Sequence, residues 1–261
     1  MRLKLLFSFL IIALLLTDYA VQAQIRNPQD LYDLVLKKYD KFGYVKYKEL
    51  CGDSRLAEYV CYLKTIDPEK LTPASDELAY WINEYNAFSL KLICDHYPLK
   101  SINDLNTGIG ILRPLFGATV MDKKLIPYGK DLISLNDIVK KEIWAKYKDP
   151  RIYFALVFAA KDCPPLRDEQ YEGDKISMQL NEQARLFLND TTKNYFDVKN
   201  RIAYLSSIFQ WHENDFGKNR EEMLIYISRF LPKNISSDII SFTKKWDVVY
   251  KDFNWSLNEA N

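Results

Sequence analysis

The stretch SDELAYWINEYNAFSLKLICDH, residues 75–96, decides the fold. Ser75 is a residue type that caps helix N-termini, Pro73 precedes it and Pro98 follows, so the stretch predicts one long helix. Its apolar side chains cover most of the helix surface: Trp81, Ile82, Tyr85, Ala87, Phe88, Leu90, Leu92 and Ile93. A helix that is apolar nearly all round belongs inside a protein, so we expect this one to be buried.

Helices and strands alternate irregularly around this helix. Capping residues and apolar spacing predict further helices over residues 27–39, 53–63, 134–149, 174–188 and 219–232, and a short one ending at Gly217. Turn signals predict hairpins over 118–133 and 194–205, and a strand over 248–253.

The segment after Pro150 is the best candidate for a central strand. Residues 152–160 carry no charge, are rich in aromatic and branched side chains, and lie between prolines, which favours a strand buried on both faces near 151–160. The mixed order without regular βαβ units predicts an α+β fold with helices packed around a small mixed or antiparallel sheet. Without a linker or a repeat, residues 24–261 are expected to form a single domain.

The N-terminus indicates export. Met1 to Lys4 carries two basic residues, an apolar run follows to Leu16, and small residues at positions 21 and 23 fit a leader-peptidase site. The run is too short to cross a bilayer as a helix, which takes about 20 residues. We expect a signal peptide over 1–23, a mature chain from Gln24, no membrane span after cleavage, and a secreted or periplasmic location.

Charge argues against nucleic acid as a partner. Removing residues 1–23 takes two of 36 basic and one of 35 acidic residues, so 34 of each remain. Without an excess of positive charge, the long-range attraction that underlies nucleic-acid binding is missing. The sequence has no C-x-x-C, and its two histidines, His96 and His212, have no second ligand at metal-binding spacing. We therefore expect no metal site and no cofactor.

The four cysteines, Cys51, Cys61, Cys94 and Cys163, permit disulfides in an oxidising compartment. Four cysteines allow three pairings, and spacing alone does not choose among them. A bond from Cys51 to Cys61 is one open alternative, because the short loop between them closes easily.

Two amides on the long helix form the first candidate site. Asn83 and Asn86 stand three residues apart on one face, beside Trp81 and Tyr85. Buried amides are costly unless they are hydrogen-bonded, so both need partners. One interpretation is a polar wall of a binding pocket that holds a carbonyl or positions a catalytic group. The other is that they bond the backbone of a neighbouring loop and lock the fold.

Cys163 is the candidate nucleophile. It follows the expected central strand, and the nearby cations Arg151 and Lys161 would favour its thiolate. A thiol nucleophile also needs a base within hydrogen-bond reach, and the sequence offers only His96 and His212. The alternative is a buried structural thiol or half of a disulfide.

Five segments in order carry a further signal: Trp81-x-Asn83-x-Tyr85-Asn86-Ala87, Asp95-His96-Tyr97-Pro98 with Ser101-Ile102, Ser134-Leu135-Asn136-Asp137-Ile138, Asp149-Pro150-Arg151-Ile152 ending in Cys163-Pro164-Pro165-Leu166, and Asn254-Trp255-Ser256-Leu257-Asn258. Over about residues 42–258 they resemble the domain of unknown function 547 family. By analogy, that family is linked to papain-like and transglutaminase-like cysteine hydrolases.

The sequence departs from this family pattern at three positions. The pattern has a histidine after the Asp-Ile helix start, another in the 151–160 segment and a second cysteine at its end. The corresponding residues here are Lys140, Tyr153 and Phe158. The chain thus resembles a non-catalytic member, which implies an exported protein that binds a peptide or a small molecule. The alternative is a cysteine-dependent hydrolase or acyltransferase that acts on a peptide-like substrate through Cys163.

Overall fold

A computed structural model describes residues 28–106 and 119–260 of the chain. The signal peptide expected over residues 1–23 lies outside these ranges. Within them, every helix is too short or too polar to cross a membrane.

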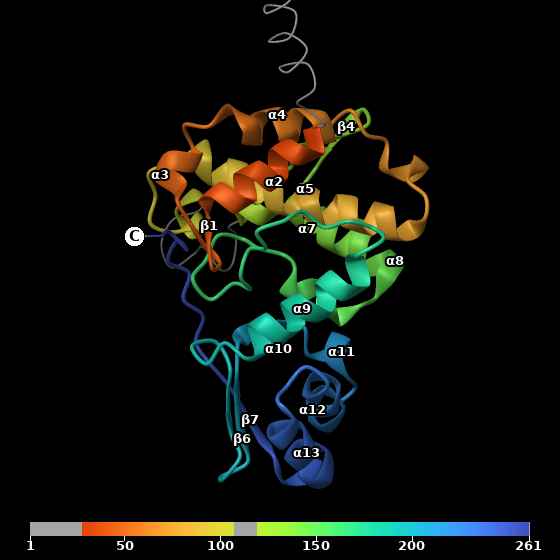
Figure 1. Cartoon of the computed structure of the whole chain (residues 1–261), viewed down its shortest axis with the longest axis vertical. Helices are drawn as coiled ribbons and strands as arrows, with labels where there is room; N and C mark the ends of the chain where they lie inside the picture. The colour runs from red at the N-terminus through yellow and green to blue at the C-terminus, as the bar shows by residue number, and fades with distance from the viewer. Residues whose placement is uncertain (1–27, 107–118, 261) are drawn as a thin grey trace, which may run out of the picture.

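The fold is α+β, as predicted, and helices dominate it (Figure 1). The α-helices are α2 (Pro28–Tyr39), α3 (Tyr47–Leu50), α4 (Ser54–Leu63), α5 (Ala74–Cys94), α7 (Leu135–Asp137), α8 (Ala145–Tyr147), α9 (Ile176–Leu188), α10 (Ser207–Trp211), α11 (Glu213–Phe216), α12 (Arg220–Ser228) and α13 (Lys233–Phe242). The strands are β1 (Asp40–Lys41), β2 (Tyr44–Val45), β3 (Ile126–Tyr128), β4 (Asp131–Ile133), β5 (Tyr195–Asp197), β6 (Ile202–Leu205) and β7 (Asp247–Tyr250).

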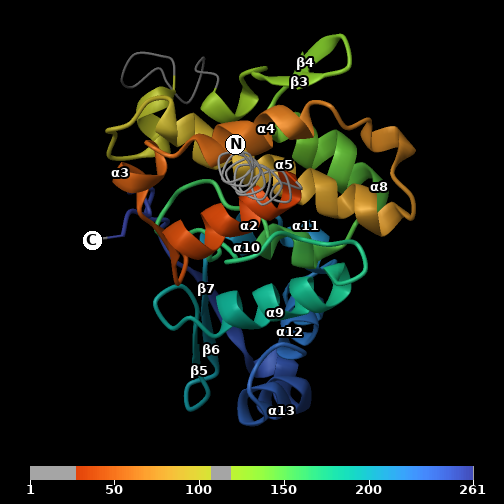
Figure 2. The same ribbon diagram turned by 45° about the horizontal axis from the view of Figure 1, so that its top comes forward.

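Helix α5 is the buried helix that the sequence predicts. Trp81 and Ile82 on it are fully buried, and α4 packs along it while α2 packs on α4 (Figures 1 and 2). Ser134 and Asp137 form the expected capping box at the start of α7. From there a π-helical stretch, η5 (Ile138–Trp144), runs into α8 and packs against α5.

The segment expected to be the central strand is not a strand. It begins as a 3₁₀ helix, η6 (Pro150–Phe154), because Pro150 suits the first helical turn and the Asp149 side chain accepts a hydrogen bond from the Arg151 backbone. The segment is buried, as predicted. Beyond η6, the backbone of Ala155 and Val157 bonds an amide side chain of α5, and the end of the segment pairs with the C-terminal segment only at an isolated bridge between Ala160 and Leu257. The uncharged buried run therefore does not form a strand.

The disulfide joins Cys51 and Cys94, with the two Cα atoms 4.8 Å apart. The alternative bond between Cys51 and Cys61 is wrong. Cys61 is exposed on α4, whereas Cys51 follows α3 and meets the end of α5. A short loop favours closure, but the direction in which each helix points its side chain decides the pairing.

The largest sheet lies at one end of the molecule, away from α5, rather than at its centre (Figure 1). Strands β5 and β6 form the predicted hairpin, and β7 adds to β6 in parallel with Ile202 opposite Asp247. Helices α9, α12 and α13 enclose a second hydrophobic cluster with this sheet, around Trp246 and Phe209. Helix α13 is not predicted by the sequence; it follows Pro232, where the helix predicted over 219–232 ends.

Candidate functional site

The amides of α5 bond the backbone of two buried segments. The Asn86 Nδ2 donates to the Ala155 carbonyl (2.9 Å), and its Oδ1 accepts from the Val157 N–H (2.9 Å). The Asn83 side chain bonds Tyr171 in the same way: its Nδ2 donates to the Tyr171 carbonyl (2.8 Å), and its Oδ1 accepts from the Tyr171 N–H (2.9 Å). Each amide bonds backbone groups that no strand pairs, and this is the locking role that the sequence left open.

Cys163 is a buried thiol with 1% of its surface exposed. Burial raises the pKa of this thiol to about 12, more than the charge of Lys193 lowers it. Lys193 is tied to the same residue, since its Nζ donates to the Cys163 carbonyl at 2.7 Å. The cation that acts on Cys163 is therefore neither of the two that the sequence suggested.

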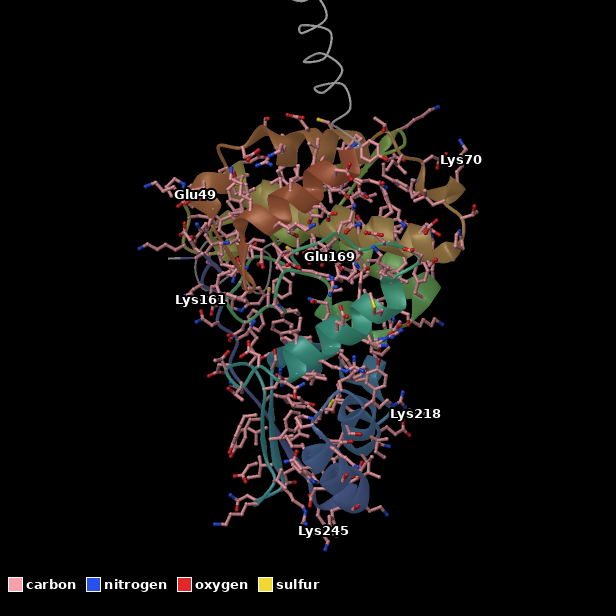
Figure 3. All side chains as sticks on the ribbon, viewed as in Figure 1. Glu49, Lys70, Lys161, Glu169, Lys218 and Lys245 are labelled. Atoms are coloured by element: carbon pink, nitrogen blue, oxygen red, sulfur yellow. A yellow bond between two sulfur atoms is a disulfide. The ribbon has the colours of Figure 1, made fainter. Side chains whose placement is uncertain are left out.

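Those two predicted cations lie elsewhere. Lys161 is exposed and reaches outward at the periphery (Figure 3). The Arg151 guanidinium binds the Asp149 carboxylate, 2.5 Å at its nearest, and Asn181 Oδ1 at 2.8 Å.

The predicted site residues do not share one cavity. Asn83, Tyr85 and Arg151 line three different cavities, and the described residues Trp81, Asn86, Lys161 and Cys163 line none of those three. The residues that the sequence predicted as one pocket around Cys163 therefore lie at separate places in the structure.

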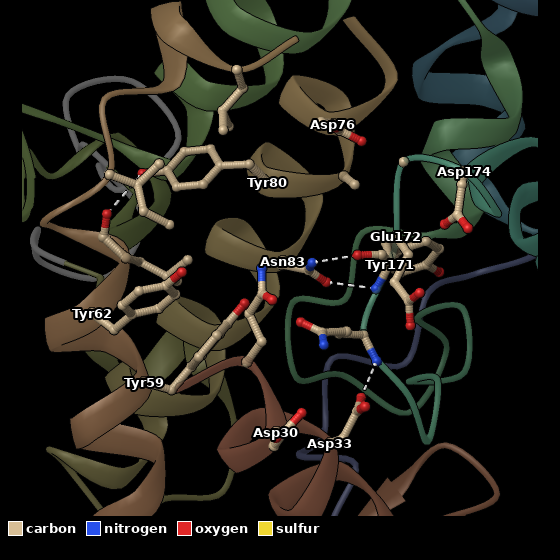
Figure 4. A pocket seen from close by; sticks show the side chains of 17 residues that line it. Asp30, Asp33, Tyr59, Tyr62, Asp76, Tyr80, Asn83, Tyr171, Glu172 and Asp174 are labelled. Carbon is tan, nitrogen blue, oxygen red and sulfur yellow. Dashed lines mark hydrogen bonds between the residues drawn. The ribbon is translucent and has the colours of Figure 1, made fainter. Parts of the chain in front are cut away.

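The cavity at Asn83 holds about 480 Å³ and is acidic (Figure 4). Its lining combines tyrosines with carboxylates: Tyr59, Tyr62, Tyr80, Asp30, Asp33, Asp76, Glu172 and Asp174. The Asp33 carboxylate accepts a hydrogen bond from the Gln170 N–H at 2.7 Å, and burial raises its pKa. In the described part of the chain, no three histidine, cysteine or acidic side chains are grouped so that they could hold a metal ion. The carboxylates give this cavity an acidic lining.

The cavity at Tyr85 is different, and we call it the aromatic cleft. It holds about 490 Å³ and lies where α5, η5, α10, α11, the 153–158 segment and the C-terminal segment meet. Its lining residues are Tyr85, Met121, Asn136, Val139, Lys140, Trp144, Tyr153, Leu156, Phe158, Ile208, Trp211, His212, Asp215 and Trp255. Small-molecule sites are concave, mostly apolar, and about 300–1,000 Å³ in volume, and the aromatic cleft has these properties.

Two groups of rings line it. In the first, the Tyr153 ring lies 5.3 Å from Trp144 and stacks on the His212 imidazole at 3.8 Å between centroids. In the second, Trp255 lies 5.6 Å from both Phe158 and Trp211. These rings come from segments far apart in the chain, so their meeting is a product of the tertiary fold.

An acid, a phenol and an imidazole meet at the first group of rings. The Tyr153 hydroxyl donates to the Asp215 Oδ2 at 2.6 Å, and the His212 Nδ1 lies 3.6 Å from the same oxygen. Burial raises the pKa of Tyr153 and lowers that of His212, although Asp215 partly offsets the shift of the histidine. At neutral pH His212 is therefore uncharged, and its ring packs as an apolar surface on Tyr153.

The π-helical stretch supplies three lining residues. Val139, Lys140 and Trp144 lie on η5, whose wider turn lets residues four and five apart face the same side. Such π-helical segments are rare and occur frequently at functional sites. Lys140 is exposed.

Comparisons with known proteins agree with the resemblance seen in the sequence. Residues 68–188 match the family described as "Protein of unknown function, DUF547". No curated protein and no solved structure matches the chain. The three positions at which the resemblance implies two histidines and a cysteine, Lys140, Tyr153 and Phe158, all line the aromatic cleft.

Trp144, Trp211 and Trp255 were not predicted as site residues from the sequence, although Trp255 stands in the last of the five family segments. The available signal was the set of three departures from the family pattern, which the fold brings together.

Proposed function

We propose that this chain is an exported, non-catalytic binding protein and that its ligand, a peptide or a small organic molecule, occupies the aromatic cleft. The observation that carries this proposal is the convergence of Lys140, Tyr153 and Phe158 on one cleft. If the family performs thiol chemistry, these positions would supply it, and here they carry side chains that do not form a thiol–imidazole pair.

The cleft retains what binding requires. Aromatic rings provide large apolar contact area with little rotamer freedom to lose, and charged groups at the edge orient a ligand. Among the described residues that line it none is a cysteine, so a bound molecule would meet rings, Lys140 and the His212–Asp215 pair.

The cysteine hydrolase alternative would place the nucleophile at Cys163. That thiol is buried, its pKa is raised, and it does not line the aromatic cleft. A thiol nucleophile needs a lowered pKa and access to substrate, so these observations favour binding over catalysis.

The tryptophans allow a test that does not depend on knowing the ligand. In the chain labelled with ¹⁵N at its five indole groups, a library of small ring-bearing molecules is screened by NMR. Ligands of the cleft should shift the signals of Trp144, Trp211 and Trp255 and leave the core residues Trp81 and Trp246 unchanged. Trp211→Leu should remove the response, and Ile240→Ala, at an exposed position on α13, should retain it. A screen whose hits all act elsewhere would refute the proposal.

Export is tested separately. The mass of the protein recovered outside the cytoplasm should correspond to a chain that begins at Gln24. A mature fraction that retains Met1 would contradict export by a cleaved signal peptide.

A further inference from the structure

We infer that the ligand of the aromatic cleft is an organic acid: an apolar, ring-bearing body with one carboxylate that binds Lys140. This inference rests on the proposed function and specifies the chemical class of its ligand.

The first observation is the state of the three lysines on η5 and α8. Lys141 pairs with Asp137 at 2.7 Å, and Lys146 pairs with both Glu77 and Glu142. Lys140 forms no ion pair or hydrogen bond with any described residue, although its neighbours satisfy theirs within the helix and with α5. Of these three ammonium groups, the one that lines the cleft is the one left for a ligand.

One carboxylate, that of Asp122, interacts with the charge of Lys140, but its oxygens already accept other hydrogen bonds. Asp122 accepts hydrogen bonds from the Thr119 hydroxyl and the Asn136 amide, both at 2.6 Å. These bonds and the charge of Lys140 lower the pKa of Asp122, so the two side chains interact across space without direct contact. The Asp122 oxygens thus bond other residues, and among the described residues the Lys140 ammonium has no carboxylate in direct contact.

The second observation is an excess of donors. The indole N–H groups of Trp144, Trp211 and Trp255 donate no hydrogen bond to the part of the chain that the structure describes. On the acceptor side, Asp215 is taken by the Tyr153 hydroxyl. Among the described residues, an ammonium group without an ion pair and three indole N–H groups without a protein acceptor belong to the lining of the cleft, and a carboxylate supplies both the negative charge and the acceptors that match them.

The body of the ligand follows from the lining. A lining rich in flat rings favours a flat or ring-shaped apolar group, because aromatic faces pair best in offset-stacked or edge-to-face arrangements. His212 adds to this surface at neutral pH, where it is uncharged. An amine of the same shape would meet Lys140 with a like charge, and the one acid among the described lining residues, Asp215, already accepts from the Tyr153 hydroxyl, so we expect the amine to bind more weakly than the acid.

Three matched probes test the inference: 4-phenylbutyrate, its amide 4-phenylbutyramide and the cation 4-phenylbutylamine. Each is titrated into the full mature chain and followed by the indole signals of Trp144, Trp211 and Trp255. We expect the acid to bind about tenfold or more tighter than the amide, and the amine to bind most weakly. Lys140→Gln should reduce the acid to the affinity of the amide, and Lys140→Glu should reverse the order of acid and amine.

Lys141→Gln is the matched control, because it removes a neighbouring charge that is paired with Asp137. It should leave all three affinities unchanged, and circular dichroism should show every variant folded. If the acid and the amide bind equally, or if Lys140→Gln keeps the preference, the inference fails while binding in the cleft stands. If none of the three probes moves the cleft signals but other library molecules do, only the organic acid is excluded. If no molecule moves them, the proposed function fails as well.

Discussion

The five tryptophans divide between two kinds of environment. Trp81 and Trp246 are fully buried, and their indole N–H groups donate to the Glu77 and Asp238 carboxylates at 3.3 and 2.9 Å. Trp144, Trp211 and Trp255 line the aromatic cleft, and their N–H groups donate to no described residue. The core uses both the ring and the polar atom of its tryptophans, whereas the cleft uses the ring and leaves the polar atom available. This difference separates residues that hold the fold from residues that can hold a ligand.

Replacement of one tryptophan from each environment tests this division most directly. Trp81→Ala should lower the free energy of unfolding by about 3–5 kcal/mol, since it opens a large cavity beside Tyr80 and Tyr128. Trp211→Ala should cost about 1 kcal/mol or less, because 44% of its surface is already exposed. Denaturant unfolding measures both. Equal midpoints for the two variants would show that the cleft tryptophans also hold the core together.

The next prediction concerns a polar group of α5 that the core does not fully satisfy. Glu84 is buried, its Oε1 has no hydrogen-bond partner in the described structure, and burial raises its pKa from 4.5 to about 8. The folded state therefore keeps this proton to higher pH than the unfolded state. The corresponding stability is fully present below about pH 4.5 and is lost as the pH rises towards 8.

Glu84→Gln should remove most of that loss. At pH 8 the variant should be more stable than the parent by a few kcal/mol, since one pKa unit corresponds to about 1.4 kcal/mol. Asp40, whose pKa burial raises to about 6, should leave a smaller residual slope in the acidic part of the range. The check is denaturant unfolding of both chains from pH 4 to 9. A parent whose stability does not fall over this range would mean that Glu84 has a partner in solution.

The hydrogen bonds of the Asn86 amide should contribute less to the free energy of unfolding than Trp81 does. Asn86→Ala would leave the Ala155 carbonyl and the Val157 N–H unpaired in a buried segment, and we expect a loss of about 2–3 kcal/mol. Asn200→Ala is the matched control, at an exposed turn where the amide bonds only Asp197. It should change the unfolding free energy by about 0.5 kcal/mol or less. A loss at Asn86 no larger than the control would indicate that water replaces these hydrogen bonds.

The sequence predicted features that depend on local signals. Helix α5 follows from its flanking prolines and its apolar surface. Asp53 caps α4, and Ser134 and Asp137 form a capping box at the start of α7. Each of these signals lies within a few residues of the sequence. The strand near 151–160 was predicted wrongly, since an uncharged run reports burial but not what its backbone bonds. Only the fold reveals that the partner is Asn86.

The site could be predicted only in part. Asn83, Asn86 and Cys163 were found because they stand in dense motifs. In the structure, however, the two amides bond buried backbone and the thiol is buried. The cleft is made by single residues from distant segments, such as Tyr85, Trp211 and Trp255, and no spacing along the chain relates them. Lys140, Tyr153 and Phe158 were visible as departures from a family pattern. Their shared location was not, because proximity arises from tertiary packing.

The last prediction is the smallest effect, a thiol that does not react. Cys61 and Cys163 are the free cysteines among the described residues, the first exposed and the second buried. Iodoacetamide should therefore modify the exposed Cys61 in the folded protein and leave Cys163 intact, because Cys163 is buried and burial raises its pKa to about 12. Peptide mass measurements across pH read both sites in one sample, and in denaturant both should react at similar rates. Rapid modification of Cys163 near neutral pH, with Cys163→Ser still folded, would indicate a reactive thiol and not a structural one. The hydrolase alternative would then replace the binding proposal.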